Sequence, residues 1–149
     1  MVLTDKIRKD LKEALKRQDK TQISTLRLVL SEIKNVEIAQ RKPLDDNKTL
    51  DVITREVKRH RESIEVFRQG NRNDLVAQEE AELGILMDYL PKQMGHEEII
   101  AAARRAIDAI EAKGTRDKGK VMSQLMPQLK GKADGKEVSD IVSELLGSM

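Results

Sequence analysis

The segment from Lys113 to Lys136 has the residue types best suited to binding a ligand. It holds seven basic side chains against two acidic ones, a net charge of +5 in 24 residues, together with four glycines. Lysine and arginine supply positive charge, and glycine lets backbone N–H groups approach an anion closely. These are the properties of a surface that contacts phosphate groups. The candidate residues are Arg116, Lys118, Gly119, Lys120, Lys130, Gly131, Lys132 and Lys136.

The same segment has a plainer explanation, in which it forms two solvated turns between short helices. Composition alone does not separate the two explanations. Residues 114–121, GTRDKGKV, also come close to the phosphate-binding loop of nucleotide hydrolases. Val121 replaces the Ser or Thr that holds magnesium in that motif, and an alanine-rich helical pattern precedes it where the motif requires a strand. We therefore do not expect a nucleotide site.

No set of residues for independent catalysis can be assigned. The chain has no cysteine, which excludes a thiolate nucleophile and a Cys-based zinc site. His60 falls near the apolar stripe of its predicted helix, so we expect a hydrogen-bonded histidine at the core edge, not a ligand. His96 has no partner at a metal-ligand spacing. Glu37 is expected to pair with Arg41 or Arg55. We expect no metal and no cofactor.

A second basic stretch covers residues 55–61. Its basic side chains scatter around the predicted helix, and glutamates lie among them. This pattern is typical of a surface with intrahelical ion pairs.

The elements that must position these side chains are helices. With one Phe, one Tyr and no Trp, the core must be built from aliphatic residues, and apolar side chains recur at spacings of three and four. The apolar stripes lie within 7–15, 23–36, 50–67, 75–90, 99–110, 121–129 and 138–146. Caps are expected at Thr4, at Gly95 with Glu98, and at Asp134 with Glu137. Pro127 is expected to kink or shorten its helix.

The fold class that follows is all-α. We expect an antiparallel four-helix N-terminal domain, residues 1–94, followed by a smaller three-helix domain, residues 95–149. No stretch approaches the roughly 20 apolar residues that span a bilayer, and charges come too early for a secretory signal. The expectation is a soluble cytoplasmic protein without a membrane partner.

Composition also limits how this chain can bind RNA. Almost no aromatic side chain is available for base stacking, the main way of recognising single strands. Contact must therefore rest on the phosphates, riboses and shape of a folded RNA. The net charge of +2 predicts weak binding by the chain alone.

Short motifs in order along nearly the whole chain resemble the stand-alone GatB/YqeY family. They are 34–38 (KNVEI), 61–65 (RESIE), 74–75 (DL), 79–83 (EEAEL), 89–94 (YLPKQM), 119–122 (GKVM) and 129–135 (LKGKADG). The sequence departs at Gly95-His96, where the family often has Ser, which affects only a helix cap.

The resemblance implies an all-α protein whose C-terminal part is similar to the tail of GatB, a subunit of the tRNA-dependent amidotransferase. That tail contacts tRNA, and similar domains on some glutaminyl-tRNA synthetases aid tRNA binding. The GatB catalytic domain has no counterpart here. The family label of carbon–nitrogen ligase with glutamine as amido-N-donor is therefore inherited by homology, and no residue here is expected to be catalytic.

The leading hypothesis is a non-catalytic tRNA-binding module linked to tRNA-dependent amidotransferase or aminoacylation. Its partners would be tRNA and an amidotransferase or aminoacyl-tRNA synthetase, with no DNA. Two alternatives remain open. One is a protein-interaction adaptor without direct RNA contact. The other is an accessory to glutamine-dependent carbon–nitrogen ligase activity that acts only in complex.

Overall fold

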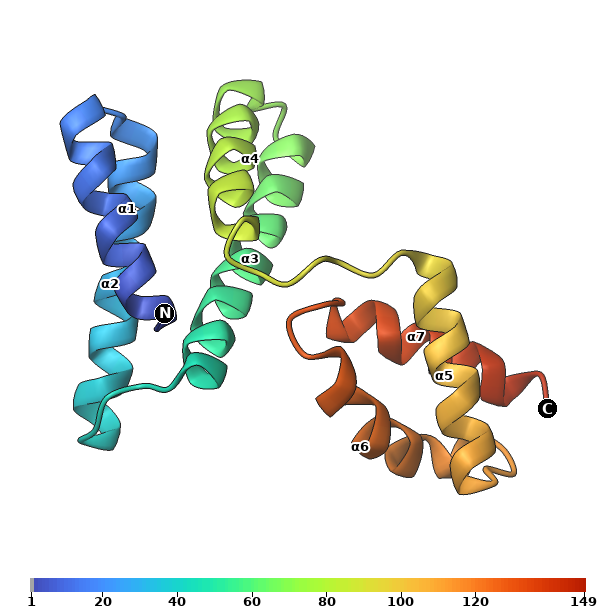
Figure 1. Cartoon of the computed structure of the whole chain (residues 1–149). Helices are drawn as coiled ribbons and strands as arrows, with labels where there is room; N and C mark the ends of the chain where they lie inside the picture. Colours follow the sequence, from blue (N-terminus) through green and yellow to red (C-terminus); the bar gives the residue numbers. More distant parts are fainter. Residues whose placement is uncertain (1) are drawn as a thin grey trace. The chain divides into compact units, whose positions relative to one another are not determined.

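The computed structural model describes residues 2–149 and shows an all-helical chain (Figure 1), which confirms the predicted fold class. No strand occurs in the described residues. The elements are α1 (Leu3–Arg17), α2 (Lys20–Gln40), α3 (Asp46–Gln69), α4 (Asn73–Met87), α5 (His96–Ile110), the 3-10 turn η1 (Thr115–Asp117), α6 (Lys118–Leu129) and α7 (Gly135–Gly147). Among these residues, no helix combines the length and the apolar character needed to span a membrane.

The contacts divide the chain into two compact units, Met1–Leu90 and Pro91–Met149. The residues just after Leu90 belong to the second unit because their polar groups bond within it. The Gln93 side-chain amide donates to the Gly131 carbonyl at 2.7 Å, and the Met94 N–H donates to the Lys132 carbonyl at 2.8 Å. Whether the two units fold independently, with a boundary at residue 94, stays a prediction.

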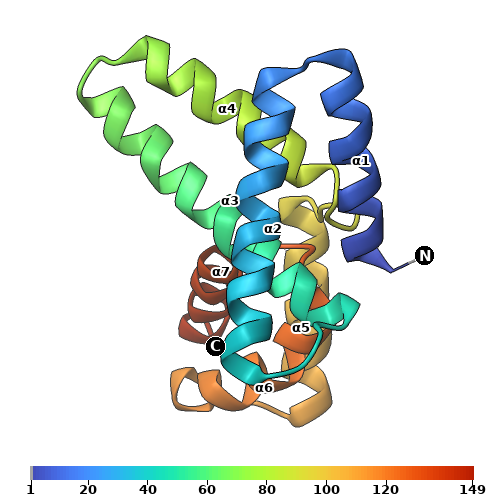
Figure 2. The ribbon, with the colours of Figure 1, turned by 90° about the vertical axis from the view of Figure 1, so that its left-hand side faces the viewer.

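The first unit consists of two helical hairpins, α1–α2 and α3–α4 (Figure 2). Their apolar stripes meet in a core of aliphatic side chains, including the fully buried Ile7, Leu26, Ile33, Ile53 and Leu86. Burial of a side chain of this size stabilises the fold by about 1.5–3 kcal/mol. The α3–α4 hairpin extends beyond the part of it that is buried against the other helices. Its loop end stands away from α1 and α2 in both views (Figures 1 and 2).

Two expected side-chain roles in this unit are wrong. The carboxylate of Glu37 does not pair with arginine; it accepts the Leu44 N–H at 3.0 Å and so fixes the loop between α2 and α3. Thr4 does not cap α1, which begins one residue earlier at Leu3. Its hydroxyl is buried and lies 3.4 Å from that of Thr49. The Thr4 hydroxyl thus has a partner distant in the sequence, whereas Glu37 accepts from a backbone N–H seven residues away.

In the second unit α5, α6 and α7 surround a separate aliphatic core. Ile99, Val121, Leu125, Val138 and Val142 are all fully buried there. Pro127 lies inside α6, yet the helix continues to Leu129. Neither expected capping box forms, because Gly95 and Asp134 occupy the N-cap positions of α5 and α7 without a side-chain cap hydrogen bond.

Candidate nucleic-acid interface

The basic residues of the 113–136 segment lie at the two ends of α6. Arg116, Lys118 and Lys120 lie in η1 and the first turn of α6, and we call them the amino-terminal cluster. Lys130 and Lys132 follow the last turn of α6, and we call them the carboxyl-terminal cluster. The turns that bear them are at opposite ends of the helix in Figure 1. At 1.5 Å per residue, Lys120 and Lys130 are about 15 Å apart along the axis, so the structure forms two contact points and not one pocket.

The cationic groups of both clusters are accessible. Arg116, Lys120, Lys130 and Lys132 are exposed, and Lys118 is half-exposed. Among residues 2–149, no ion pair ties Arg116, Lys118, Lys120 or Lys132 to a carboxylate. These four charges therefore face water and remain available to an anionic partner.

Asp117, which lies between Arg116 and Lys118, has another partner. Its carboxylate accepts the backbone N–H of Lys113 at 2.8 Å, which closes the turn before η1. Consequently it makes no side-chain cap hydrogen bond to α6, although it holds the N-cap position. The start of α6 thus combines the positive end of a helix dipole with basic side chains, a combination that favours an anion.

The two glycines assigned to the site have different roles. Gly131 has a φ of +75°, and a Cβ there would lie 3.4 Å from Pro91 Cδ. Its backbone geometry and its contact with Pro91 explain this glycine without any ligand. Gly119 is exposed in the first turn of α6, and a Cβ there would meet nothing within 4 Å. The fold does not require glycine at this position, although glycine is unfavourable in a helix.

Lys136 is separated from the other basic residues by its surroundings. It lines a shallow hollow on α7 together with Asp134, Glu137, Asp140 and Glu144. His96 is on the rim of this hollow, with Nδ1 3.4 Å from Glu137 Oε1. The negative charge around Lys136 opposes an RNA phosphate, so this residue is the least suited of the predicted set to that role.

Between the two clusters, α6 presents a neutral polar face that the sequence analysis missed. Ser123, Gln124 and Gln128 are exposed, and the helix contains no acidic residue. Lys120, Gln124 and Gln128 follow one another at a spacing of four, which places them on one face of the helix. Amide and hydroxyl groups bond phosphate and ribose oxygens. The spacing was visible in the sequence, but exposure of this face was not.

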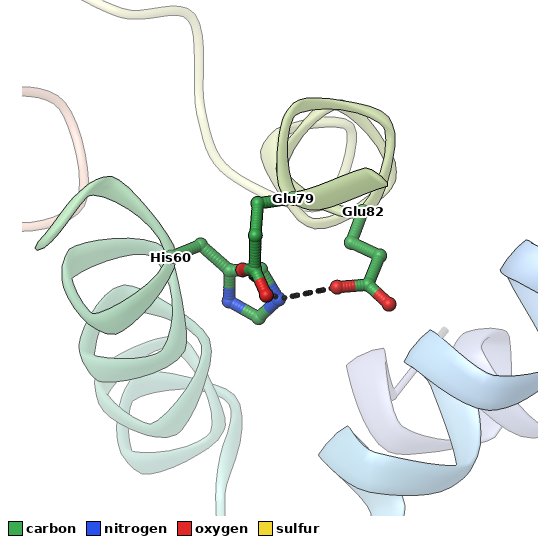
Figure 3. A group of neighbouring side chains, drawn as sticks. All are labelled: His60, Glu79 and Glu82. Atoms are coloured by element: carbon green, nitrogen blue, oxygen red, sulfur yellow. Dashed lines mark hydrogen bonds and ion pairs between the residues drawn. The ribbon is translucent and has the colours of Figure 1, made fainter. Parts of the chain in front are cut away.

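A second group of polar side chains lies in the first unit. His60, on α3, is buried and hydrogen-bonded, as the sequence predicted. Its Nδ1 lies 2.8 Å from the Glu56 carbonyl oxygen, and its Nε2 faces the carboxylates of Glu79 and Glu82 on α4 (Figure 3). The nearby Arg59–Glu56 pair, at 2.8 Å, is one of the intrahelical ion pairs expected in this stretch.

The sequence of the chain is similar to that of a known protein family. The profile of the family described as "Yqey-like protein" matches residues 4–146. The chain is thus a member of the YqeY-like family.

Several proteins of similar sequence come from fungi. The chain is 31% identical to "Altered inheritance of mitochondria protein 41, mitochondrial" of Pyrenophora tritici-repentis, over 99% of this chain and 82% of that protein. Proteins of the same name from Lachancea thermotolerans and Saccharomyces cerevisiae are 42% and 33% identical, over 56% and 70% of this chain. The matches cover 46% and 58% of those two proteins, about half their length.

These names contradict the cytoplasmic location expected from the sequence, so that prediction is wrong. All three relatives are named as mitochondrial proteins. The expectation rested on charges near the N-terminus, which argue against a secretory signal and do not distinguish among compartments reached by other routes.

Proposed function

We propose that this protein is a non-catalytic tRNA-binding module that acts with tRNA-dependent amidotransferase or aminoacylation. The surface of α6 makes the contact: the amino-terminal and carboxyl-terminal clusters bind phosphates, and the polar face between them contacts the sugar-phosphate backbone. The observation that carries the proposal is that four accessible cationic side chains, Arg116, Lys118, Lys120 and Lys132, lie at the two ends of an acid-free helix, and within residues 2–149 none of them pairs with a carboxylate.

The spacing of the clusters favours a folded RNA over an isolated phosphate. A separation of about 15 Å is too long for one anion and corresponds to several phosphates along a nucleic acid backbone. A helix that contacts two ridges of such a backbone recognises shape, which suits a chain that has one Phe, one Tyr and no Trp. Since A-form geometry and the 2′-hydroxyl distinguish RNA from DNA, duplex DNA is expected to bind less tightly.

The catalytic step is assigned to a partner, an amidotransferase or an aminoacyl-tRNA synthetase. The exposed polar side chains of α6 are lysine, serine and glutamine. We assign no pair of nucleophile and general base among them. A tRNA-binding module attached to such an enzyme raises the local concentration of tRNA at its active site. This arrangement includes an accessory role in glutamine-dependent carbon–nitrogen ligation, which the chain would support only in complex.

The test is tRNA binding by the full chain and by the variant Lys120→Ala/Lys130→Ala/Lys132→Ala, which removes charge from both clusters. The matched control is Lys9→Ala/Lys12→Ala/Lys16→Ala, which removes the same charge from exposed positions of α1. We expect the steepness of the plot of log affinity against log salt concentration to fall by about one for each of the three cluster lysines removed. Equal loss of binding in both variants would show that only net charge matters and would remove the assigned interface.

A second candidate function is a protein-interaction adaptor, and one observation favours it. Leu15 and Leu28 are 45% and 44% exposed and, with Ile23, line one hollow at α1 and α2. Apolar side chains gathered in this way are typical of protein contact sites. An adaptor predicts a partner that remains bound after nuclease treatment and in high salt, and that is lost in Leu15→Ser/Leu28→Ser but retained in the α6 variant.

A further inference from the structure

The α3–α4 hairpin brings together three groups with the chemistry of a metal site, and none of them is used by the proposed function. His60 projects from α3, while Glu79 and Glu82 project toward it from α4 (Figure 3). Glu79 and Glu82 are three residues apart, so they lie on the same face of their helix. The candidate ligand atoms of these three residues lie within 4.8 Å of one another.

The hydrogen bond of His60 to the backbone fixes which ring nitrogen is available. The Glu56 carbonyl oxygen can only accept, so Nδ1, at 2.8 Å, must carry the proton and donate it. Nε2 is then the nitrogen that faces Glu79 and Glu82. A histidine whose second nitrogen donates to a backbone carbonyl has the orientation that metal-binding histidines commonly adopt.

The two carboxylates have no cationic partner other than this imidazole. In the part of the chain that the structure describes, neither Glu79 nor Glu82 forms an ion pair with lysine or arginine. Their side chains are only 22% and 16% exposed, and that of His60 only 8%. Carboxylates withdrawn from water in this way require a compensating positive charge. A metal ion bound between these groups would supply it.

The distances between the ligand atoms suit a metal ion. Nε2 lies 3.2 Å from an oxygen of Glu82 and 3.6 Å from an oxygen of Glu79. Ligands bound at 2.0–2.1 Å in a tetrahedron are about 3.3 Å apart. These two distances are close to that value, and the two carboxylate oxygens, within 4.8 Å of each other, can reach it by side-chain rotation. The remaining exposure of the glutamates leaves room for a water molecule as the fourth ligand.

An ion bound by His60, Glu79 and Glu82 would also affect the stability of the α3–α4 hairpin, because of where these residues lie. Ile64 is the last buried apolar residue of α3, and Leu86 is the one buried residue of α4. His60 and Glu82 face each other on the loop side of Val57 and Leu86, which are the buried core-cluster residues of α3 and α4 nearest the loop. An ion bound to both helices would stabilise this part of the hairpin.

We propose that His60 Nε2 and one carboxylate oxygen each of Glu79 and Glu82 bind a divalent transition-metal ion, with water completing the coordination. A nitrogen and two carboxylates suit Zn²⁺ and Mn²⁺ better than Mg²⁺, which prefers oxygen ligands and retains its waters. The ion bridges α3 and α4 and raises the stability of the first unit. This proposal is independent of RNA binding, because α6 contributes no ligand.

The test uses untagged full-length protein that has been treated with a chelator and then titrated with Zn²⁺ in a calorimeter. The variants are Glu79→Gln and Glu82→Gln, which keep side-chain size and a hydrogen-bond acceptor. The matched control is Glu80→Gln, the same change at an exposed position of α4 whose carboxylate pairs with Arg68 at 3.2 Å. His96→Gln removes the other histidine, so the remaining imidazole signal in a nitrogen NMR spectrum is that of His60.

We expect one Zn²⁺ per chain in the wild type, in Glu80→Gln and in His96→Gln, with a shift of the His60 Nε2 resonance and an increase in the unfolding temperature. Glu79→Gln and Glu82→Gln should each weaken binding at least tenfold, in line with the loss of a ligand. The absence of Zn²⁺ binding at neutral pH would overturn the proposal. Equal affinity in all variants, or loss of binding in His96→Gln alone, would overturn it as well.

Discussion

The two glycines at the ends of α6 predict substitutions with effects of opposite sign on stability. Gly119→Ala should stabilise the second unit by about 0.5–1 kcal/mol, since alanine favours the helix and restricts the unfolded chain. Nothing within 4 Å opposes the added Cβ. Gly131→Ala should destabilise it by about 1–2 kcal/mol, because a φ of +75° is unfavourable for an L side chain and the Cβ would press on Pro91.

The free energy of unfolding of each variant is measured by urea denaturation, followed by far-ultraviolet circular dichroism. The two variants should differ by about 2 kcal/mol, which for a domain of this size corresponds to a difference of about 8–16 °C in the unfolding temperature. If both changes shift stability in the same direction, the structural distinction between the two glycines is wrong.

The same pair also tests the RNA interface. A methyl group at position 119 would lie on the exposed start of α6, between Lys118 and Lys120. If the RNA backbone approaches the helix there, Gly119→Ala weakens tRNA binding while it raises stability, and a loss of folding cannot explain that combination. Unchanged affinity would show that the backbone at Gly119 is not approached closely.

Two further predictions concern the two units. Burial, and then the 2.5 Å hydrogen bond to Asp10 and the charges of Asp10 and Asp88, raise the pKa of Tyr89. The folded state therefore holds the phenol proton more tightly than the unfolded state, and stability falls as pH rises above about 10. Absorbance titration of this single tyrosine, in a chain without tryptophan, should show late ionisation, and Tyr89→Phe should remove its part of the alkaline loss of stability. An ordinary titration would contradict this. Leu125→Ala leaves a cavity in the second core, where Leu125 is fully buried, and should cost about 2–5 kcal/mol. Hydrogen exchange should then show increased opening of the second unit with little change in the first, whereas equal loss of protection in both would mean that they unfold together.

Most of the fold could be predicted from the sequence because apolar spacing is a local property. A stripe at intervals of three and four predicts which side of a helix packs against its neighbours, and Ile7, Leu26, Leu125 and Val142 are core residues as their stripes require, although Leu15, at the end of the first stripe, is 45% exposed. The predicted caps were less reliable. Thr4 instead contacts Thr49, far away in the sequence, and Glu37, which was expected to pair with an arginine, accepts the Leu44 N–H in the loop that follows its helix.

The candidate interface, too, could be predicted from the sequence only in part. The sequence identified the basic segment, its glycines and the acidic residues near Lys136, but it could not show that these acidic residues line one hollow with Lys136 or which of the lysines are exposed. Those properties depend on which residues share a surface after folding.

The sequence by itself determined the helical class, the aliphatic cores, the family motifs and the local excess of positive charge, because each depends on residue type and near spacing. Only the tertiary structure decided that His60 meets Glu79 and Glu82, and that Gly131 adopts a φ of +75° beside Pro91 whereas a Cβ at Gly119 would meet nothing within 4 Å. The physical reason is that these contacts join residues on different elements, and the distance between such residues is set only when the helices pack.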